Sequence, residues 1–329
     1  MQKLLSITIP AYNSEKYINK CLDSLIDKDI MSFFEVIVVN DGSQDGTRDI
    51  VEQYTAKYPQ TFRLINKENG GHGSVVNRGI QEARGKYFCV LDSDDWYDTK
   101  ALKTLVQHLA NTDIDIVLTN YQKVYKDTNE TKKYTYDLSI YGNVLDIDYL
   151  LNNNIAVAMA NIVYKLSILK NVNLRLQEKT YYVDEEYAVI PFSRIKSITA
   201  LNIILYNYLI GHQEQSMSII NQINNLSDKK KVALNLINFY NQTNMSASNR
   251  MYVLKKIQNL IVFVFPIAMI YNSNKRQGRK FSKQFVKEIK HLNKEIFIKL
   301  RMKYYAYKLM SLIGLSTQQY EHIQARRGN

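Results

Sequence analysis

Short apolar runs alternate with helical patterns along the first 120 residues of this 329-residue chain. Five apolar runs, rich in β-branched or aromatic side chains, are predicted strands: residues 4–9, 35–40, 62–66, 86–91 and 114–121. Four intervening segments carry helical signals and are predicted helices: residues 14–27, 45–58, 73–83 and 100–111. Strands and helices that alternate at this spacing indicate right-handed β–α–β units. They predict an α/β fold with a mostly parallel sheet and helices on both faces.

The pattern changes twice further along the chain. Residues 122–225 are irregular, with a loop that enters a helix at 180–192 and a further predicted strand at 197–209. From residue 226 onward the chain is predicted to be helical. Apolar residues recur every three or four positions between 281 and 300, with lysines between them, which is typical of an amphipathic helix.

Charge supports a division into two parts. We expect one α/β domain over residues 1–225, in halves 1–120 and 121–225, followed by a basic helical region over 226–329. Residues 229–329 hold 20 Lys and Arg against three Glu, a formal charge of +17, whereas the first 228 residues hold 23 Lys and Arg against 28 Asp and Glu, or −5. This asymmetry indicates that the two parts have different partners.

Cysteine usage and hydropathy indicate the compartment. Cys21 and Cys89 both lie in apolar segments, so we expect buried, reduced thiols rather than a disulfide. The first ten residues are strand-like and do not resemble a signal peptide. The longest apolar stretch, residues 260–271, contains Pro266 and is shorter than the roughly 18 residues that a membrane span needs. We therefore expect a cytoplasmic protein, with peripheral attachment to the inner face of the membrane as an option.

Polar loops follow three of the predicted strands. The first strand is followed by Pro10, Tyr12 and Asn13, the second by Asp41, and the fourth by an acidic loop at residues 92–95. Because parallel sheets bind ligands beyond the carboxyl ends of their strands, we expect these loops to meet at one edge.

The acidic loop places Asp92, Asp94 and Asp95 within four residues. Carboxylates this close repel one another, and a bound divalent cation relieves the repulsion. Oxygen ligands suit Mg²⁺ or Mn²⁺, which also bind the oxygens of a diphosphate. A loop closed by an Asx turn, with an acid capping the next helix, explains the same residues without a metal, and these residues alone leave both interpretations open.

Two further loops contain glycines that allow the backbone to approach a ligand. Asp41 precedes a glycine and would accept a hydrogen bond from a base or a ribose, or simply form a turn. Residues 69–74 contain three glycines at a predicted helix start, where N–H groups can meet an anion, and Arg78 adds positive charge one turn later. His72 fits this site or an ordinary surface loop. Neither loop matches the Gly-x-x-x-x-Gly-Lys or Gly-x-Gly-x-x-Gly phosphate motifs.

The order of these motifs is more specific than any one of them. The series is Ser-Ile-Thr-Ile-Pro-Ala-Tyr-Asn at 6–13, Val-Ile-Val-Val-Asn-Asp-Gly-Ser at 36–43, Asn-Arg-Gly-Ile at 77–80 and Leu-Asp-Ser-Asp-Asp-Trp at 91–96. This series resembles the family 2 glycosyltransferases of the GT-A fold, of the type that builds bacterial polysaccharides and other cell-surface glycans. The resemblance is strong over about the first 120 residues and fades by about residue 220.

The resemblance implies a role for each matching residue. Asp94 would ligate the metal that bridges to the diphosphate. Asp92 would lie near the ribose and the donor sugar, and Asp95 would support the loop or the sugar. The other residues assigned to the nucleotide-sugar donor are Pro10, Tyr12, Asn13, Asp41, Asn69 and Arg78. The family often has Arg immediately before Asn77, where this chain has Val76, so the phosphate contacts would pass to Arg78, His72 or the metal.

The resemblance extends more weakly into the acceptor half. Family members carry an acidic pair before a helix, whose Asp serves as catalytic base. Here Val183 replaces the first acid, so the base is assigned to Asp184. Acids at a helix start are also favoured by the helix dipole, which explains residues 184–186 without catalysis. His212 resembles the family's late His or Arg over the donor phosphates and would contact the diphosphate when protonated or the metal when neutral.

Three interpretations fit the basic C-terminal region. It is the solvated face of a packed helical domain, or it attaches to an anionic membrane surface, or it binds nucleic acid. Nucleic acid is the least favoured, because no binding module is recognisable and the acidic N-terminal part would repel phosphates. We therefore expect no nucleic-acid partner; an oligomer is compatible with the sequence.

These observations together predict an inverting, metal-dependent glycosyltransferase. It would move a sugar from a nucleotide-sugar donor, expected to be UDP-linked, to a hydroxyl of a glycan acceptor, either lipid-linked or a cell-surface polymer such as teichoic acid. Mn²⁺ or Mg²⁺ is the expected cofactor. The alternative is a catalytically degenerate GT-A protein that binds nucleotide sugars or tethers an assembly to the membrane.

Overall fold

The computed structural model describes residues 3–211 and 218–327. The chain divides into two compact units, residues 1–213 and 214–329, so this boundary lies earlier than the one predicted near residue 225. The first unit contains the β-sheet, and the described part of the second unit is helical.

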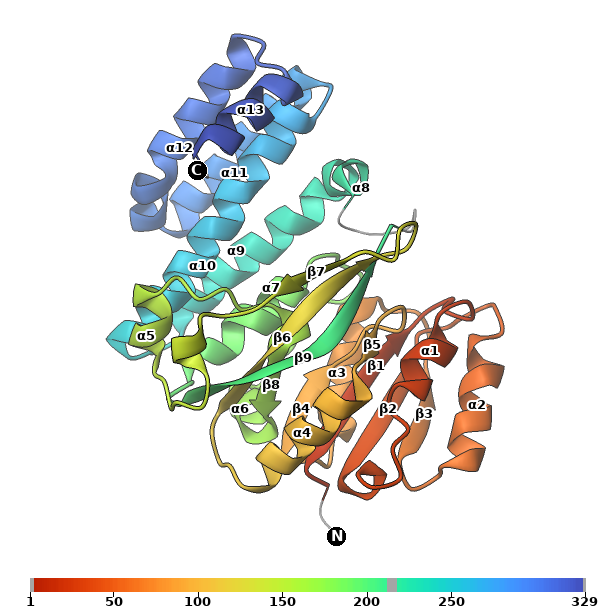
Figure 1. Ribbon diagram of the computed structural model, residues 1–329. Coiled ribbons are helices and arrows are strands. Elements are labelled where there is room, and N and C mark those ends of the chain that lie inside the picture. Colours follow the sequence, from red (N-terminus) through yellow and green to blue (C-terminus); the bar gives the residue numbers. More distant parts are fainter. Residues whose placement is uncertain (1–2, 212–217, 328–329) are drawn as a thin grey trace. The chain divides into compact units, whose positions relative to one another are not determined.

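Four parallel strands form one half of the sheet. These are β1 (Leu5–Ala11), β2 (Phe34–Asn40), β3 (Phe62–Asn66) and β4 (Tyr87–Val90), in the spatial order β3-β2-β1-β4 (Figure 1). All four coincide with predicted strands to within a few residues. Their carboxyl ends share one edge, which is where the predicted polar loops begin.

The other half of the sheet mixes strand directions. β6 (Ile116–Tyr125) and β9 (Ile198–Ile210), both predicted, are parallel to each other. β8 (Ile162–Lys165) was not predicted, because four residues carry too little pattern, and it lies antiparallel between β4 and β6. β5 (Trp96–Tyr97) pairs with β9, and β7 (Thr131–Tyr134) pairs with β6.

Short helices connect these strands. The α-helices are α1 (Ile18–Asp23), α2 (Thr47–Lys57), α3 (His72–Glu82), α4 (Thr99–Ala110), α5 (Ile147–Asn152), α6 (Leu166–Asn171) and α7 (Asp184–Val189). The 3₁₀ segments are η1 (Met31–Phe33), η2 (Leu138–Ile140), η3 (Met159–Asn161) and η4 (Ile190–Ser193). α1 is shorter than the predicted helix at 14–27, because turns replace helical hydrogen bonds at both of its ends.

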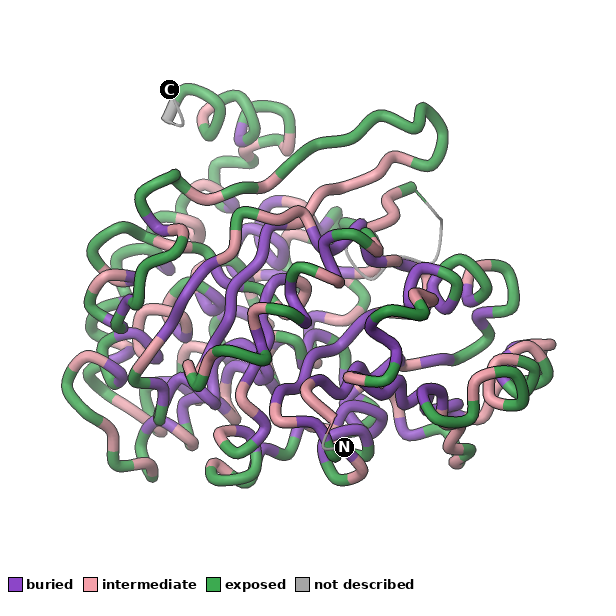
Figure 2. Tube along the Cα trace, turned by 60° about the horizontal axis from the view of Figure 1, so that its bottom comes forward, coloured by how far each residue is buried: buried purple, intermediate pink, exposed green. Residues whose placement is uncertain are grey.

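Helices cover both faces of the sheet, as predicted. Alternate residues of β1 face opposite sides, and Leu5, Ile7 and Ile9 are fully buried in a core shared with α1, α2 and α4. On the other face, a Cβ at Gly79 of α3 would lie 2.2 Å from Oγ1 of Thr8, so only glycine permits this contact. Figure 2 shows the central strands as continuous buried segments.

Both cysteines are buried and free, as predicted. Cys21 and Cys89 are 0% and 1% exposed and form no disulfide. Burial raises the pKa of the Cys89 thiol to about 12. Both thiols are therefore protonated and unreactive at neutral pH.

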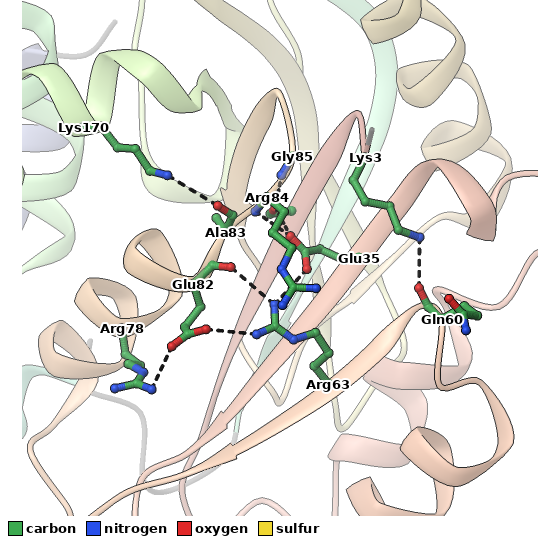
Figure 3. A network of polar contacts seen from close by, with 11 residues as sticks. Lys3, Glu35, Gln60, Arg63, Arg78, Glu82, Ala83, Arg84, Gly85 and Lys170 are labelled. Atoms are coloured by element: carbon green, nitrogen blue, oxygen red, sulfur yellow. Dashed lines mark hydrogen bonds and ion pairs between the residues drawn. The ribbon is translucent and has the colours of Figure 1, made fainter. Parts of the chain in front are cut away.

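A buried carboxylate, Glu35, fastens the amino-terminal edge of the sheet (Figure 3). Its Oε1 accepts hydrogen bonds from the Ser6 hydroxyl and the Arg84 backbone N–H, each at 2.7 Å, and its Oε2 pairs with Arg63 Nη1 at 3.1 Å. Arg63 also pairs with Glu82 of α3 at 3.0 Å. One carboxylate thus connects β1, β3 and the turn before β4.

We expect Glu35→Gln to lower the free energy of unfolding by about 2 kcal/mol, because it leaves part of the Arg63 charge uncompensated in a buried network. Arg48→Gln is the matched control, since the Arg48–Glu52 pair is 59% and 46% exposed, and it should cost less than about 0.5 kcal/mol. Urea unfolding measures both. Equal losses for the two variants would contradict this role of Glu35.

The described part of the second unit consists of helices, in agreement with the prediction. They are α8 (Ile219–Asn224), α9 (Leu226–Gln242), α10 (Ala247–Pro266), the π-helical η5 (Ile267–Tyr271), α11 (Lys275–Leu292), α12 (Lys294–Leu312) and α13 (Thr317–Arg327). The single amphipathic helix predicted across 281–300 is wrong, because Asn293 separates α11 from α12. Asn293 has an extended backbone, and its Oδ1 caps α12 by accepting from the Ile296 N–H at 3.0 Å.

One helix of the second unit has the length and composition of a membrane span. Residues 247–271 have a mean hydropathy of 1.7 over their most apolar window, and 61% of that window is buried within the protein. We expected no membrane span because the apolar run at 260–271 is short. The helix that contains this run is longer than the run itself. Its burial is equally typical of the core helix of a helical bundle.

Candidate active site

The predicted polar loops meet at the carboxyl edge of the parallel strands. Ser14, after β1, and Ser93, after β4, lie with their hydroxyl oxygens 2.7 Å apart. The loops after β1 and β2 are joined by two bonds: the Asn13 N–H donates to Ser43 Oγ at 3.0 Å, and the Gln44 N–H donates to Asn13 Oδ1 at 2.9 Å. Asn13 takes a left-handed conformation, with φ of 49°, which asparagine tolerates. The expected convergence is confirmed.

Asp41, at the end of β2, is a buried carboxylate with partners inside the protein. Its Oδ1 accepts from Lys67 Nζ at 2.6 Å and from the Gly70 N–H at 2.9 Å, and its Oδ2 accepts from the Gly71 N–H at 2.8 Å. Gly71 has φ of +79°, a conformation that favours glycine. Asp41 therefore holds the glycine-rich start of α3 against β2.

Asp95 is the buried member of the acidic loop. It is 1% exposed, and its two oxygens accept from the Tyr206 hydroxyl at 2.6 Å and the Leu209 N–H at 2.7 Å. Burial and the neighbouring charges of Asp94 and Asp92 raise the pKa of Asp95. Its contacts anchor the acidic loop to β9, so Asp95 supports the loop from inside the fold.

None of the three acids caps the next helix. The N-cap of α4 is Asp98, whose Oδ1 accepts from the Ala101 N–H at 2.8 Å. This removes capping as an explanation for Asp92, Asp94 and Asp95. A backbone turn does close the loop, with the Asp95 N–H donating to the Asp92 carbonyl at 3.1 Å.

Asp92 connects the acidic loop to α3 through His72. Nε2 of His72 lies 3.1 Å from Asp92 Oδ1, and the Tyr206 hydroxyl lies 3.4 Å from Oδ2. Burial lowers the pKa of His72, but the hydrogen bond and charge of Asp92, with the charges of Asp184 and Asp41, raise it above its ordinary value. His72 thus belongs to the site and is not an isolated surface histidine.

Asp94 is the acid in the loop that best suits a divalent cation. Among the residues that the structure describes, no three His, Cys, Asp or Glu side chains converge into a ready-made metal site. Asp95 is 1% exposed, whereas Asp94 is only partly buried. Mg²⁺ and Mn²⁺ sites are often completed by one or two carboxylates plus substrate phosphates. The residues therefore fit a cation held jointly by Asp94 and a bound diphosphate.

Asp184 is exposed at the first position of α7, whose first turn holds three acids. The third of these, Glu186, is completely buried and accepts from the Gln177 backbone N–H at 2.9 Å and from its side-chain amide at 2.7 Å. A favourable interaction with the helix dipole explains acids at the start of a helix, but it does not explain why Glu186 is buried. Glu186 instead fixes the position of α7, and with it that of Asp184.

The segment before α7 packs against the start of α3. The Asn77 side chain donates to the Leu176 carbonyl at 2.9 Å and accepts from the Leu176 N–H at 2.8 Å. A Cβ at Gly73 would lie 2.1 Å from the Gln177 carbonyl oxygen, so glycine is required there. These contacts bring Asp184 within electrostatic reach of the acidic loop. The charge of Asp184 helps to raise the pKa of His72. It also helps to raise the pKa of Tyr208, to which burial and the three acids of the loop contribute more.

The remaining predicted donor residues are placed differently. Pro10 is partly exposed and Tyr12 is 51% exposed at the same edge, and the Asn69 side chain donates to the Asp41 carbonyl at 3.0 Å. Arg78 instead pairs with Glu82 at 2.8 Å, in the network at the amino-terminal edge (Figure 3). His212 lies outside the described residues.

Two site residues were missed from the sequence. Lys67 follows the third strand, and the edge rule for parallel sheets could have drawn attention to it. Tyr206 donates to Asp95, but nothing in the apolar strand at 197–209 marks which of its residues faces the loop. The pairing of β9 with β5 and β6 determines which residues of β9 face the acidic loop.

The second unit contains two cavities, of about 650 and about 520 Å³, and among the residues that line them Glu288 is the only carboxylate. Neither of these two cavities groups acids as the acidic edge of the first unit does.

Comparison with known proteins identifies the family. The model of glycosyl transferase family 2 matches residues 6–172, just over half of the chain's 329 residues. The chain belongs to glycosyl transferase family 2. The family predicted from the sequence is therefore confirmed.

The proteins similar to this chain include glycosyltransferases of bacteria. The putative glycosyltransferase EpsH of Bacillus subtilis is 40% identical over 127 residues, covering 39% of this chain and 36% of EpsH. The poly(ribitol-phosphate) beta-glucosyltransferase of Bacillus spizizenii is 26% identical over 227 residues, covering 65% of this chain and 33% of that protein. The matched stretch is thus only about a third of each relative.

The fold matches that of a solved structure. The crystal structure of S. aureus TarS 1–349 in complex with UDP-GlcNAc aligns with a TM-score of 0.69 at 18% identity, over 98% of this chain and 92% of that one. The predicted GT-A fold with a C-terminal helical region is confirmed.

The contact between His72 and Asp92 can be tested through the pKa of His72. NMR titration should place the pKa of His72 above its ordinary value of 6.5, and Asp92→Asn should lower it. His108, whose pKa is lowered by burial, is the control and should not change. Because the folded-state pKa of His72 is raised, the pair's stabilisation is complete below about pH 6.5 and is lost as pH rises through that pKa. An unchanged His72 pKa in Asp92→Asn would show that the pair does not form.

Proposed function

We propose that this protein transfers a sugar from a nucleotide-sugar donor to a hydroxyl of a glycan acceptor, with inversion at the anomeric carbon. The observation that supports this most directly is the hydrogen-bonded convergence of the loops after β1, β2 and β4 into one acidic edge. The charge of Asp184, from another part of the chain, acts on the same edge. Membership of the family supplies the reaction class.

The donor is proposed to be a UDP-sugar. TarS, which shares the fold, was solved with UDP-GlcNAc. The exposed ring of Tyr12, beside Pro10 and Asn13, offers a surface on which a base can stack. Asp41 and Asn69 would border the nucleotide, with Asp92 nearer the ribose and the sugar. Arg78 is left out of this site because it pairs with Glu82.

A divalent cation, Mn²⁺ or Mg²⁺, is proposed to be held by Asp94 together with the donor diphosphate. When bound, it would offset the negative charge of the diphosphate leaving group. Asp95 would keep the loop in place through its contacts with β9 and need not touch the donor.

Asp184 is proposed as the catalytic base. It is a carboxylate at the exposed start of a helix whose position is fixed by Glu186, so it can present an oxygen to the acceptor. The carboxylate takes the proton of the acceptor hydroxyl while the oxygen attacks the anomeric carbon. The bond from that carbon to the diphosphate breaks, and the nucleoside diphosphate leaves with the bonding electrons. A single displacement of this kind inverts the anomeric centre.

The acceptor is proposed to be a lipid-linked glycan or an anionic cell-surface polymer. A formal charge of +17 over residues 229–329 favours a polyanion or a lipid surface. One relative is named as a poly(ribitol-phosphate) glucosyltransferase, which is consistent with a polymer of the teichoic-acid type.

We expect Asp184→Asn to reduce kcat by about 10²- to 10⁴-fold, with little change in the affinity for the donor, because it removes only the base. Glu185→Gln, at the adjacent position on the same helix, is the matched control and should retain most activity. Sugar transfer is measured with a panel of UDP-sugars and a polymer acceptor. Full activity of Asp184→Asn would eliminate it as the base. Intact UDP binding without transfer by the wild type would favour the degenerate, binding-only alternative.

A further inference from the structure

The outward face of α12 carries a continuous row of exposed apolar side chains. Five of them are 53–73% exposed and recur at alternating spacings of four and three: Ile298, Met302, Tyr305, Leu309 and Leu312. Successive helical residues turn by about 100°, so these five side chains lie within an arc of about 80°. We call them the α12 stripe.

The opposite face of α12 already forms the contact with the rest of the unit. Ile296, Leu300 and Tyr304 are at most 5% exposed and point away from the stripe. α12 is therefore apolar on two opposite faces, of which only one is covered by the protein. A helix that is apolar all round is normally buried on all sides, so the stripe requires a partner.

The neighbouring helix shows what a solvated face looks like in the same unit. In α11, Phe285 and Ile289 are buried, and the exposed positions include Lys283, Lys287 and Lys290. α11 follows the usual amphipathic pattern and α12 does not. The stripe is thus particular to α12.

Positive charge borders the stripe on both sides. By helical spacing, Arg301 and Lys308 lie along one side of it, and Lys299 lies along the other. Within the described part of the chain none of these three forms a salt bridge, and Glu295 is the only acid in α12.

We propose that α12 binds in the plane of an anionic lipid surface, with the stripe inserted among the acyl chains and the flanking cations at the headgroups. This combination is the one that surface-bound amphipathic helices use, since long Lys and Arg side chains can reach the headgroups while their stems stay apolar. Tyr305 suits the boundary between headgroups and acyl chains.

A second copy of the chain fits the stripe less well. Pairing two stripes would bring like charges together on both sides, which is unfavourable. A stable protein interface also uses roughly 20 residues from each partner, far more than one row of five. The charge pattern therefore favours anionic lipid. The proposal does not depend on the glycosyltransferase reaction, because no residue of the acidic edge takes part.

The test is flotation of the full-length protein with vesicles of phosphatidylcholine containing 30% phosphatidylglycerol. The test variant is Ile298→Gln, Met302→Gln, Leu309→Gln, whose sites are all exposed. The control is Leu138→Gln, Val144→Gln, Met251→Gln, at sites that are 78%, 70% and 61% exposed. We expect partitioning of the test variant to fall at least tenfold and that of the control to stay within about twofold of wild type. Pure phosphatidylcholine, or high salt, should also weaken wild-type binding.

A Tyr305→Trp variant gives an independent signal that leaves the stripe apolar. Its indole emission should shift to the blue when anionic vesicles are added, after subtraction of the wild-type Trp96 signal. No shift, or equal flotation of the test variant and wild type, would overturn the proposal. So would a wild-type dimer that the test variant converts to monomer without any vesicle binding. Donor hydrolysis by the test variant, expected at the wild-type rate, separates this outcome from a failure of the proposed enzymatic function.

Discussion

Crowding of negative charge at the end of β4 is the constraint on which the rest of the site depends. Three carboxylates within four residues repel one another, so each needs its own compensation. Asp95 is buried with the Tyr206 hydroxyl and the Leu209 N–H, and Asp92 faces His72. These contacts tie the acidic loop to β9 on one side and to α3 on the other. Asp94 is only partly buried, and it is the acid through which we propose that the loop holds an external cation.

Backbone contacts also link the acidic edge to the segment that leads into α7. The start of α3 contacts Asp41 through the N–H groups of Gly70 and Gly71, and the Gly70 carbonyl accepts from the Lys179 N–H at 2.7 Å. Because Glu186 holds Gln177 in the same segment, a small set of backbone contacts fixes Asp184 relative to the acidic loop. Glycine is favoured at Gly71 and Gly73, where these segments approach most closely.

Much of this arrangement could be predicted from the sequence, for identifiable reasons. The first four strands are continuous apolar runs, and parallel strands must present their following loops at one edge, so the grouping of Asn13, Asp41 and Asp92 followed directly. Strand β8 and the contact from Tyr206 to Asp95 depend on tertiary pairing that leaves no local pattern. In the helical unit, the apolar spacing between residues 281 and 300 predicted a helix. That spacing did not reveal the break at Asn293, where an asparagine cap outweighs it.

We propose that the acidic edge binds a nucleotide diphosphate together with a divalent cation through Asp94. Calorimetric titration of UDP with and without Mn²⁺, using the wild type and Asp94→Asn, tests this binding. Mn²⁺ should strengthen UDP binding by the wild type at least tenfold, about 1.4 kcal/mol, and Asp94→Asn should lose that gain while keeping its metal-free affinity. Metal-independent UDP binding by wild type, or an unchanged metal effect in Asp94→Asn, would contradict it.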